Sequence, residues 1–566
     1  MKWNHSVDVL VVGSGNGALT AALCNYEMGT KDVLIIEKTD QYGGSSSIGG
    51  GGVWIPCNRY AKQAGAQDTP EDAMTYLNNT IPEGTVEQSM LRAYLANGPK
   101  MIQFLHDRTH VRYHSLGVYP DYFSDADGAR LGHRSLEPEP LDITRLQERG
   151  EYLRQTHPMM LIFGLVPITQ EEAHVFMAQL RGWVMLAMKL ILSYLLDIPQ
   201  RVRTRRSRRS ACGSAGVARL ALSVEDRKIP LWLNTEMTEL VVEDGQAVGV
   251  RVRKDGKEMT IQGRKAVLLA SGGFEHNQLM REKYLPKPTN KAWSAGHKGN
   301  TGTAIEIAMQ HGAAVKAMDG SWWCTTIRVP GEDSPRLSIM EKSYPGSCVV
   351  NRQGKRIANE SMNYQMYVQE CFKARKGGVP IEELWMVFDA RFRAHYLVGP
   401  LMTSKLMPDM FLPKRFYAEE FLTKADSIEA LANKTGIDRE GLAETIRNMN
   451  EYARTGVDEE FNRGGFAYDR YYGDPAITPN NCLAPIGKSP FYAIRLYLGD
   501  FGTNGGLVTT TDAQVVREDG NVFAGLYATG NCSAPVLPTY PGPGSTLGPA
   551  MTFAYQAAKH INDFSD

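Results

Sequence analysis

Residues 7–18 read VDVLVVGSGNGA, an apolar run that ends in the glycine pattern G-x-G-x-x-A. A helical pattern follows as far as Met28, and a second apolar run, Val33–Ile36, ends at Glu37. This order is that of a strand–helix–strand unit in which the glycine turn and the helix N-terminus hold a pyrophosphate. An acid at the end of the second strand can accept a hydrogen bond from a ribose hydroxyl. The stretch therefore predicts a Rossmann-like dinucleotide-binding domain with a doubly wound parallel sheet.

Residues 42–53, YGGSSSIGGGGV, follow this unit directly. So much glycine does not suit the interior of a helix or strand, but it lets the backbone lie along a pyrophosphate or an isoalloxazine ring. Three later segments look like parts of FAD-binding domains: a strand and hairpin at 234–250, an apolar strand and turn at 265–274, and a last strand at 525–531. They favour FAD over a nicotinamide cofactor and predict a discontinuous domain that the end of the chain completes.

Residues 539–553, TYPGPGSTLGPAMTF, connect that last strand to a final helical pattern. The glycines allow the backbone to lie close against a ligand, and a helix that starts near Pro549 directs free N–H groups at it. Tyr540 adds one hydroxyl donor, and a phenol beside a free backbone N–H provides the two parts of an oxyanion hole. A glycine- and proline-rich surface turn with a packed tyrosine is the alternative.

Composition narrows the class of protein. The chain has 566 residues, 43% of them hydrophobic, which is enough for two or three domains. Lys+Arg and Asp+Glu number 62 each, so the overall charge does not indicate nucleic acid or acidic partners. The eight cysteines show no metal-ligand spacing, and the N-terminus leads directly into a strand with no room for a signal peptide. These features favour a cytoplasmic protein without a metal site.

Six segments, taken in order, resemble the 3-ketosteroid 1-dehydrogenases, a family within the FAD-dependent fumarate reductase/succinate dehydrogenase flavoprotein group. They are the fingerprint, SSSIGGGGVWIP (45–56), LLASGGFEHN (268–277), YPGSCVVNRQGKRIANES (344–361), GDFGTNGGL (499–507) and TYPGPGSTLGPAMTF (539–553). The resemblance covers the chain apart from roughly residues 157–210. The last motif is the most specific, because fumarate reductases carry a different turn there with an arginine that protonates the substrate. This chain has no arginine between Gly530 and Asp566.

The resemblance implies an α/β FAD-binding domain formed by residues 1–285 and 501–566, capped by an α+β catalytic domain at 286–500. It implies non-covalent FAD, since the serine–glycine loop lacks the histidine to which covalent fumarate reductase flavoproteins attach the flavin. The cofactor residues that it implies lie mostly at strand ends and helix starts. They are Gly13, Ser14, Gly15, Asn16, Gly17, Ala18, Glu37, Lys38, Gly44, Ser45, Ser46, Met237, Ser271, Gly272, Gly530, Asn531, Gly544, Thr546 and Leu547.

The resemblance also implies 1,2-dehydrogenation of 3-ketosteroids. Tyr540 and the Gly544 N–H would stabilise the enolate at the C3 oxygen, and a tyrosine would remove the C2 proton. Tyr364 and Tyr367 are both candidates for this base, and Tyr122 completes the pocket, with Tyr119 as a weaker candidate. A tyrosine can act as base if neighbouring hydroxyls lower its pKa below the usual value of about 10. Flavin N5 would accept the C1 hydride.

The implied role is steroid or cholesterol degradation, with a quinone or another acceptor taking the electrons. A fumarate-reductase-like enzyme and a 3-ketosteroid 4(5)-dehydrogenase are the enzyme alternatives, and the Tyr540–Gly544 turn disfavours both. A flavin-binding module without turnover is a third alternative, which loss of the tyrosines or glycines would have indicated.

Residues 157–210 are an inserted apolar and basic helical segment that the resemblance leaves uncovered. Apolar stretches at 158–168 and 183–196 precede six arginines, namely Arg201, Arg203, Arg205, Arg206, Arg208 and Arg209. The second stretch is shorter than the roughly 20 apolar residues that a transmembrane helix needs. The pattern instead predicts peripheral, monotopic contact with the cytoplasmic face of a membrane. A helical lid on the protein's own core, followed by a solvated basic loop, is the alternative.

Overall fold

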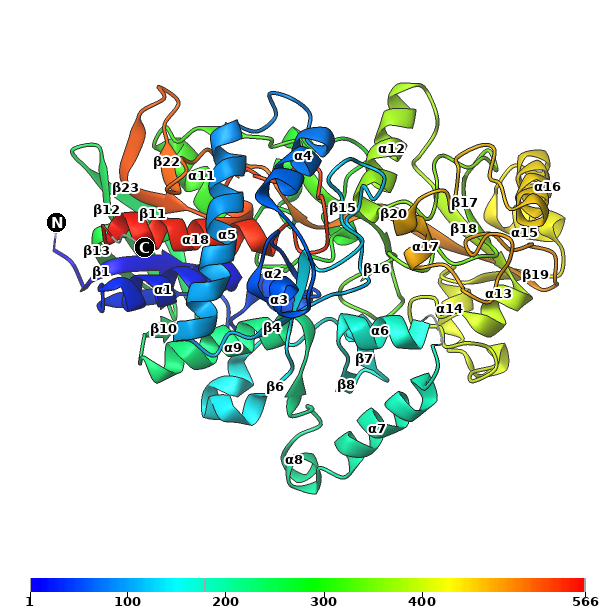
Figure 1. Ribbon diagram of the computed structural model, residues 1–566, viewed down its shortest axis with the longest axis horizontal. Helices are drawn as coiled ribbons and strands as arrows, with labels where there is room; N and C mark the ends of the chain where they lie inside the picture. The colour runs from blue at the N-terminus through cyan, green and yellow to red at the C-terminus, as the bar shows by residue number, and fades with distance from the viewer. Residues whose placement is uncertain (1, 178–179, 564–566) are drawn as a thin grey trace.

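The computed structural model describes residues 2–177 and 180–563, and two sheets organise this part of the chain (Figure 1). The first sheet has eight strands. Its parallel strands, in spatial order, are β10 (Leu231–Trp232), β2 (Val33–Ile36), β1 (His5–Val12), β13 (Lys257–Leu269) and β23 (Val522–Ala528). The antiparallel strands are β12 (Gln246–Lys254), β11 (Thr235–Glu243) and β22 (Gln514–Val516). This is the predicted doubly wound α/β sheet, and the last strand returns to it from the end of the chain.

Strand β1 is buried on both faces because its side chains alternate between two cores. Val9 and Val11 lie in one core with helices α1 (Asn16–Met28), α9 (Cys212–Asp226) and α18 (Leu547–Ile561). Leu10 and Val12 lie in the other, which includes β11, β12 and α11 (Thr303–Gln310). An apolar run without polar alternation is the pattern of a parallel strand covered on both sides.

The glycine turn after β1 requires its first glycine. Gly13 has φ +112°, and a Cβ there would lie 2.3 Å from the carbonyl oxygen of Ala270, just past the end of β13. No side chain fits between these two strand ends, so the turn stays narrow where α1 begins.

Two local predictions need correction. The strand predicted at 265–274 begins earlier: β13 is one continuous strand of 13 residues, Lys257–Leu269, that follows the hairpin of β11 and β12. Its first half pairs with β12 and its second half with β1 and β23. The glycine-rich loop contains a short helix, α2 (Gly44–Ile48), before β3 (Val53–Trp54), since three consecutive serines form one helical turn between glycines.

The second sheet has six strands. They are β16 (Arg336–Leu337), β15 (Ser321–Ile327), β20 (Phe491–Thr503), β18 (Leu384–Asp389), β17 (Ser347–Asn351) and β19 (Thr423–Ala425). Helix α12 (Tyr364–Lys376) packs against β15, and its N-cap Asn363 accepts a hydrogen bond from the Met366 N–H. The two large sheets therefore take their strands from different parts of the sequence, while the predicted domain boundaries at 285 and 500 stay predictions.

Strand β20 connects the two sheets through its last residues. The Thr503 hydroxyl accepts a hydrogen bond from the Phe274 N–H at 2.8 Å, beyond the end of β13. Asp500 forms an ion pair with Arg281 at 2.7 Å, and both side chains are fully buried. A removed partner would leave a buried charge, which costs several kcal/mol. This contact therefore holds the second sheet against the turn that follows β13.

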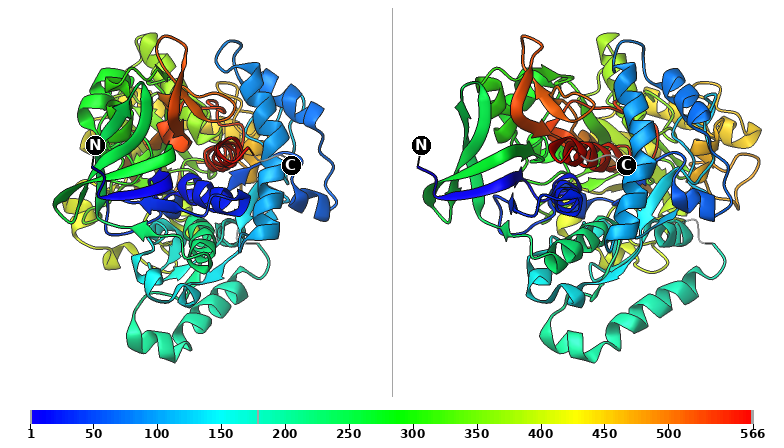
Figure 2. Two further views of the ribbon diagram at one scale, coloured as in Figure 1. Left: turned by 90° about the vertical axis from the view of Figure 1, so that its left-hand side faces the viewer. Right: turned by 60° about the vertical axis from the view of Figure 1, so that its left-hand side comes forward.

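Residues 157–210, for which we keep the name inserted segment, include α7 and α8, which project from the lower side of the molecule in Figures 1 and 2. The elements of this segment are η2 (Pro158–Met160), β7 (Leu161–Ile162), β8 (Val166–Pro167), α6 (Gln170–Met177), α7 (Trp183–Leu195), α8 (Ile198–Arg203) and β9 (Arg209–Ser210). It has a small core of its own, formed by Val166, Ile168, Ala173 and Leu190. In the part of the chain that the structure describes, no helix is long and apolar enough to span a bilayer.

Candidate active site

A cavity lies at the carboxyl ends of the parallel strands, where such sheets bind their ligands. Apart from Ala18, all of the residues predicted for the cofactor line it. Ala18 is fully buried in the core beneath α1, because the first turn of the helix directs it away from the cavity.

Two helices begin at this cavity without a side-chain cap. Helix α1 has Gly15 as its N-cap and α18 has Thr546, and neither cap side chain accepts a bond from its helix. The Asn16 N–H of α1 and the Gly548 N–H of α18 are bonded within the protein, to Ser46 Oγ and to the Gly544 carbonyl. The other N–H groups of the two first turns and the positive ends of the helix dipoles remain for an anionic or carbonyl oxygen. Gly15 and Thr546 both line the cavity. A dinucleotide with a pyrophosphate and a polar ring fits this arrangement.

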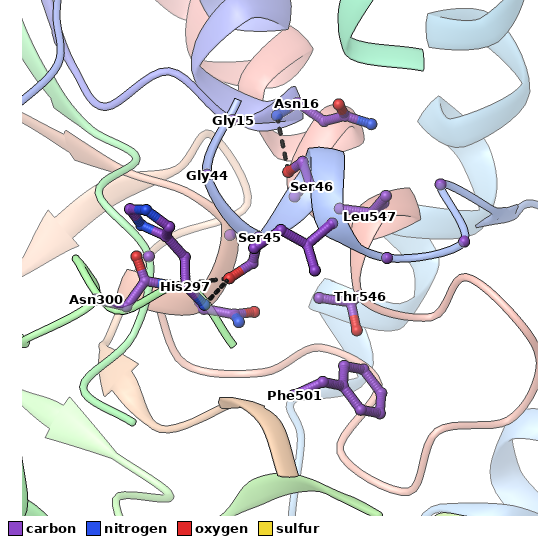
Figure 3. Close-up of a pocket in the computed structure, with 18 of the residues that line it drawn as sticks. Gly15, Asn16, Gly44, Ser45, Ser46, His297, Asn300, Phe501, Thr546 and Leu547 are labelled. Carbon is purple, nitrogen blue, oxygen red and sulfur yellow. Dashed lines mark hydrogen bonds between the residues drawn. The ribbon is translucent and has the colours of Figure 1, made fainter. Parts of the chain in front are cut away.

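The serines of α2 hold the cavity wall together (Figure 3). The Ser45 hydroxyl accepts hydrogen bonds from the His297 N–H at 2.9 Å and from Asn300 Nδ2 at 3.1 Å. The Ser46 hydroxyl accepts one from the Asn16 N–H at 3.1 Å. Sequence reasoning missed His297 and Asn300. Their signal is the G-H-K-G-N-T-G run at 296–302, a glycine-rich turn directly before α11.

Glu37 and Lys38 lie at the end of β2, in the cavity wall as predicted. Glu37 accepts hydrogen bonds from the Ser14 hydroxyl and, at 2.9 Å, from the Thr39 N–H. Lys38 Nζ donates to the Thr301 hydroxyl at 3.0 Å, and burial lowers the pKa of Lys38. The carboxylate is held beside the glycine turn, where a ribose would lie.

Three of the predicted tyrosines meet at the other end of the cavity. The ring centroids of Tyr122 and Tyr364 are 5.4 Å apart, those of Tyr122 and Tyr540 5.6 Å, and those of Tyr364 and Tyr540 5.8 Å. Phe501, which sequence reasoning missed, lies 5.9 Å from Tyr540. The three tyrosines are at most 5% exposed. We call Tyr122, Tyr364, Phe501 and Tyr540 the aromatic cage.

Gly544 lies beside the cage and cannot carry a side chain. Its φ is +102°, and a Cβ would lie 2.6 Å from the backbone of Gly52 and Val53. Its carbonyl accepts a hydrogen bond from the Trp54 N–H at 3.2 Å, which fixes the loop to β3. Tyr540 has φ +60°, an uncommon conformation for a residue with a side chain. The surrounding contacts therefore hold the turn in a conformation that it would not adopt alone.

The electrostatics of the cage differ from the expectation. Burial raises the pKa of Tyr122 and Tyr364 well above 10, and it raises the pKa of Tyr540 as well. The Tyr122 hydroxyl donates to the Tyr364 hydroxyl at 2.9 Å, which opposes the shift at Tyr364 but does not reverse it. The expected lowering of a tyrosine pKa is therefore not present in the protein alone, because desolvation penalises the phenolate more than one donor stabilises it.

Only one of the two candidate bases reaches the cavity. Tyr364 is the first residue of α12 and lines the cavity, whereas Tyr367 is absent from its wall. The Tyr367 ring is fully buried in the large core, with Lys342 Nζ 4.8 Å from its centroid. Tyr119 also lines the cavity, and its hydroxyl lies 2.6 Å from that of Tyr472.

Apolar residues from three further segments line the cavity, and sequence reasoning missed all of them. They are Met159, Met160 and Ala173 of the inserted segment, Leu337, Ile339 and Met340 of the second sheet's edge, and Tyr471. The inserted segment is therefore part of the cavity wall as well as a projection from the surface. The apolar stretch at 158–168 was the available signal, but its position over the cavity depends on long-range packing.

Comparisons with known proteins agree with this geometry. A family model described as FAD binding domain matches residues 8–547. The chain is 39% identical to the 3-oxosteroid 1-dehydrogenase of Mycobacterium tuberculosis, with 98% of each chain covered. It is 36% identical to that of Comamonas testosteroni, with 97% of this chain and 95% of the relative covered. Its structure is similar to that of the 3-ketosteroid delta1-dehydrogenase from Sterolibacterium denitrificans in complex with 1,4-androstadiene-3,17-dione. The TM-score is 0.95 and the identity 40%, and the match covers 99% of this chain and 100% of that chain. The match therefore extends over residues 157–210, which the resemblance had left uncovered, so this segment is not an insertion relative to that protein.

Proposed function

Since the chain belongs to the 3-oxosteroid 1-dehydrogenases, a family of FAD-dependent oxidoreductases, we propose that it introduces the C1–C2 double bond into 3-ketosteroids. The observation that carries this proposal is the position of Tyr364, Tyr540 and Gly544 around one end of the cavity. This arrangement offers two hydrogen-bond donors for a carbonyl oxygen and one phenol beside them.

The proposed chemistry begins at the C3 carbonyl. The Tyr540 hydroxyl and the Gly544 N–H donate to its oxygen, and these bonds strengthen as an enolate forms. Tyr364, in its deprotonated phenolate form, takes the C2 proton on its oxygen and becomes a neutral phenol, and Tyr122 donates to that oxygen while it carries charge. FAD, when bound, accepts the hydride from C1. The buried rings of the cage exclude water from these steps.

The cofactor fits the rest of the cavity. The turn at Gly13–Gly17 and the start of α1 would hold the pyrophosphate, and Glu37 the ribose. The start of α18 at Thr546–Leu547 would direct its N–H groups at the polar edge of the flavin ring. We propose that FAD is held without a covalent bond. Acid precipitation should then release all of the yellow colour, and colour in the pellet would contradict this.

The proposed reaction is tested by mixing the oxidised holoenzyme with androst-4-ene-3,17-dione under anaerobic conditions. The flavin absorption band should bleach, and a 1,4-diene should form. Bleaching by succinate, but not by the steroid, would instead favour the fumarate-reductase-like alternative. The electrons then pass to a quinone or another acceptor, and we place the reaction in the degradation of steroids such as cholesterol.

We also propose that the inserted segment rests on a membrane surface. Helix α7 is apolar on nearly all sides, but the protein covers only the face with Leu186, Leu190 and Tyr194. The opposite face is exposed: Met185 is 69% and Leu196 72% accessible, together with Val184, Met188, Leu192 and Leu195. A helix that is apolar all round belongs in a core or in lipid. The bilayer surface would cover the face that the protein leaves open.

The six arginines of the cluster fall into two groups. The sequence interpretation placed all six at lipid headgroups, and the structure corrects this for the arginines that pair within the protein. Arg208 is paired with Asp197 at 2.6 Å and Arg209 with Glu172 at 2.8 Å, while Arg206 donates to the Gly150 carbonyl. Arg201 is half-buried against the ring of Tyr194. Only Arg203 and Arg205 of the six are exposed, and Arg181 and Lys189 lie nearby in the chain and are also exposed. These four cations can meet anionic headgroups around the apolar face.

The test replaces the exposed face of α7 and keeps its buried face. Deleting residues 159–209 is unsuitable, because Met159, Met160 and Ala173 line the cavity. The variant instead carries five substitutions: Met185→Gln, Met188→Gln, Leu192→Gln, Leu195→Gln and Leu196→Gln. A control changes three exposed apolar residues elsewhere on the surface, in the part of the chain between β18 and β19: Leu406→Gln, Met410→Gln and Phe411→Gln.

Full-length holoenzyme should sediment with vesicles of phosphatidylcholine and phosphatidylglycerol at low salt. The α7 variant should stay in the supernatant with its FAD bound, while the control should sediment like the wild type. Wild-type protein that stays in the supernatant would contradict the membrane proposal. So would self-association through the α7 face in the absence of lipid.

A further inference from the structure

The loop that carries Tyr540 and the segment that carries Tyr122 meet at one carbonyl oxygen. The Pro541 carbonyl accepts a hydrogen bond from the Tyr122 N–H at 2.9 Å and another from the Tyr76 hydroxyl at 2.6 Å. The Tyr76 hydroxyl in turn accepts one from the Phe123 N–H at 3.2 Å. One phenol thus connects both segments, donating to one and accepting from the other.

Tyr76 itself does not line the cavity. It lies on α4 (Pro70–Thr80), its side chain is fully buried, and its ring packs 6.1 Å from that of Trp54. The Arg134 guanidinium lies 5.4 Å from the ring centroid, and Asp121 accepts hydrogen bonds from Arg134 at 2.8 Å and from Trp54 Nε1 at 2.7 Å. A ring held by this network leaves its hydroxyl little freedom to move.

The residue next to Pro541 needs such support. Tyr540 has φ +60°, which costs of order 1 kcal/mol or more and persists only where neighbouring contacts fix it. Ser545 closes the turn on itself, because its hydroxyl donates to the Gly542 carbonyl at 2.6 Å and accepts from the Gly542 N–H at 3.1 Å. Between these internal bonds and Tyr540 lies the Pro541 carbonyl, whose two hydrogen bonds join the turn to the Tyr122 segment.

We propose that Tyr76 is a positioning residue that sets the separation of Tyr540 and Tyr122 by clamping the Pro541 carbonyl to the backbone at Phe123. This inference rests on the proposed function, since it assigns these two tyrosines to the carbonyl oxygen and to the base. A shift of the turn would move the Tyr540 hydroxyl away from the carbonyl oxygen that it binds. Displacements below 1 Å at such a group already reduce turnover.

The test compares Tyr76→Phe with Tyr60→Phe. Tyr60 is also buried in the core of the FAD-binding half, and its hydroxyl lies 2.8 Å from Nδ1 of His106. Both variants keep the ring. Tyr76→Phe loses two buried hydrogen bonds, one donated to the Pro541 carbonyl and one accepted from the Phe123 N–H, so it should lose more thermal stability than Tyr60→Phe, and both variants should keep their FAD. In Tyr76→Phe, kcat and C2 proton exchange should fall together, by roughly tenfold, with KM changed less than about twofold. Tyr60→Phe should keep the wild-type kcat.

A second measurement does not depend on the substrate. Amide hydrogen exchange in peptides covering 119–124 and 538–546 should be roughly tenfold faster in Tyr76→Phe and unchanged in Tyr60→Phe. Equal kcat values or equal exchange in the two variants would overturn the clamp, and so would loss of FAD from Tyr76→Phe alone. Failure of the wild-type enzyme to be reduced by steroid would count against the proposed function, while hydrogen exchange would still decide the role of Tyr76.

Discussion

The aromatic cage and helix α7 are both rich in large apolar side chains, but they differ in what covers them. The cage residues Tyr122, Tyr364 and Tyr540 are at most 5% exposed, and each ring packs against the others. Met185 of α7 and Leu196, the residue that caps its C-terminus, are 69% and 72% exposed. In the cage, these side chains cover one another and exclude water. On α7 they face outward, so something other than water has to cover them. Function in the cage depends on atomic positions, whereas function on α7 depends on area and charge.

Among the cage residues, substitution of the proposed catalytic base, Tyr364, should reduce turnover most. Replacing Tyr364 by Phe removes the proton acceptor and keeps the ring, so flavin reduction by steroid should fall by about 10²–10⁴-fold and C2 deuterium exchange should cease. Tyr367→Phe, three residues along the same helix but buried in the core, is the matched control and should retain most of the activity. Equal losses of activity in both variants would contradict the assignment of Tyr364 as the base.

The oxyanion donor is the next most sensitive position. Tyr540→Phe loses one hydrogen bond to the C3 oxygen while the ring stays packed, and turnover should fall by about 10²–10³-fold. The FAD content, read from the absorption spectrum, should not change, because the backbone of the loop remains. Turnover near that of the wild type would show that the C3 oxygen is bound elsewhere.

The titration of the cage should also make the rate of flavin reduction depend on pH. Burial raises the pKa of Tyr364 above 10, and the deprotonated form is the active one, so the reactive fraction is small at neutral pH. The rate of flavin reduction should therefore increase between pH 7 and pH 9, by up to about tenfold per pH unit. Stopped-flow measurement of the first turnover would show this limb. A plateau that begins below pH 8 would mean that the pKa of Tyr364 is lower in the complex with FAD and steroid than in the protein alone.

Helix α7 and its neighbours should respond in smaller steps. Replacing Arg203 and Arg205 by Gln should weaken binding to anionic vesicles by about 1 kcal/mol each, close to fivefold per residue, and the loss should diminish as salt increases. Arg447→Gln, an exposed arginine of α16 (Arg439–Thr455), is the control and should bind like the wild type. Steroid turnover in detergent should be the same for all three proteins. If vesicle binding changes neither with these substitutions nor with the salt concentration, the apolar face of α7 alone would have to account for it.

The sequence predicted those parts of the fold that depend on local pattern. The β1 turn, α1 and β2 lie where the fingerprint placed them, since strand, glycine turn and helix follow one another without interruption. The return of β23 to the first sheet was also predicted, because an apolar run that ends in a glycine turn is the pattern of a buried parallel strand.

Three features depend on packing that the sequence does not contain. Tyr364 and Tyr367 share one helix, and only the direction of α12 relative to the second sheet decides which of them reaches the cavity. The pKa shift of the cage tyrosines had the wrong sign in the sequence interpretation because desolvation exceeds the contribution of one neighbouring hydroxyl. Arg208 and Arg209 were assigned to lipid headgroups, but Asp197 and Glu172, distant by 11 and 37 residues, pair with them.

The continuity of β20 has a consequence for the way in which substrate enters and product leaves. This strand spans the second sheet and delivers Phe501 to the cage, and the fully buried pair of Asp500 and Arg281 fastens its end beside β13. A hinge between the two sheets would have to break this pair and expose both charges. We therefore expect exchange to occur by local opening of the apolar part of the wall that Met159–Met160, Ala173 and Leu337–Met340 form, while the sheets stay together. Contact of the inserted segment with a bilayer would then act on the rate of this opening, so the surrounding lipid would influence turnover without touching the reacting atoms.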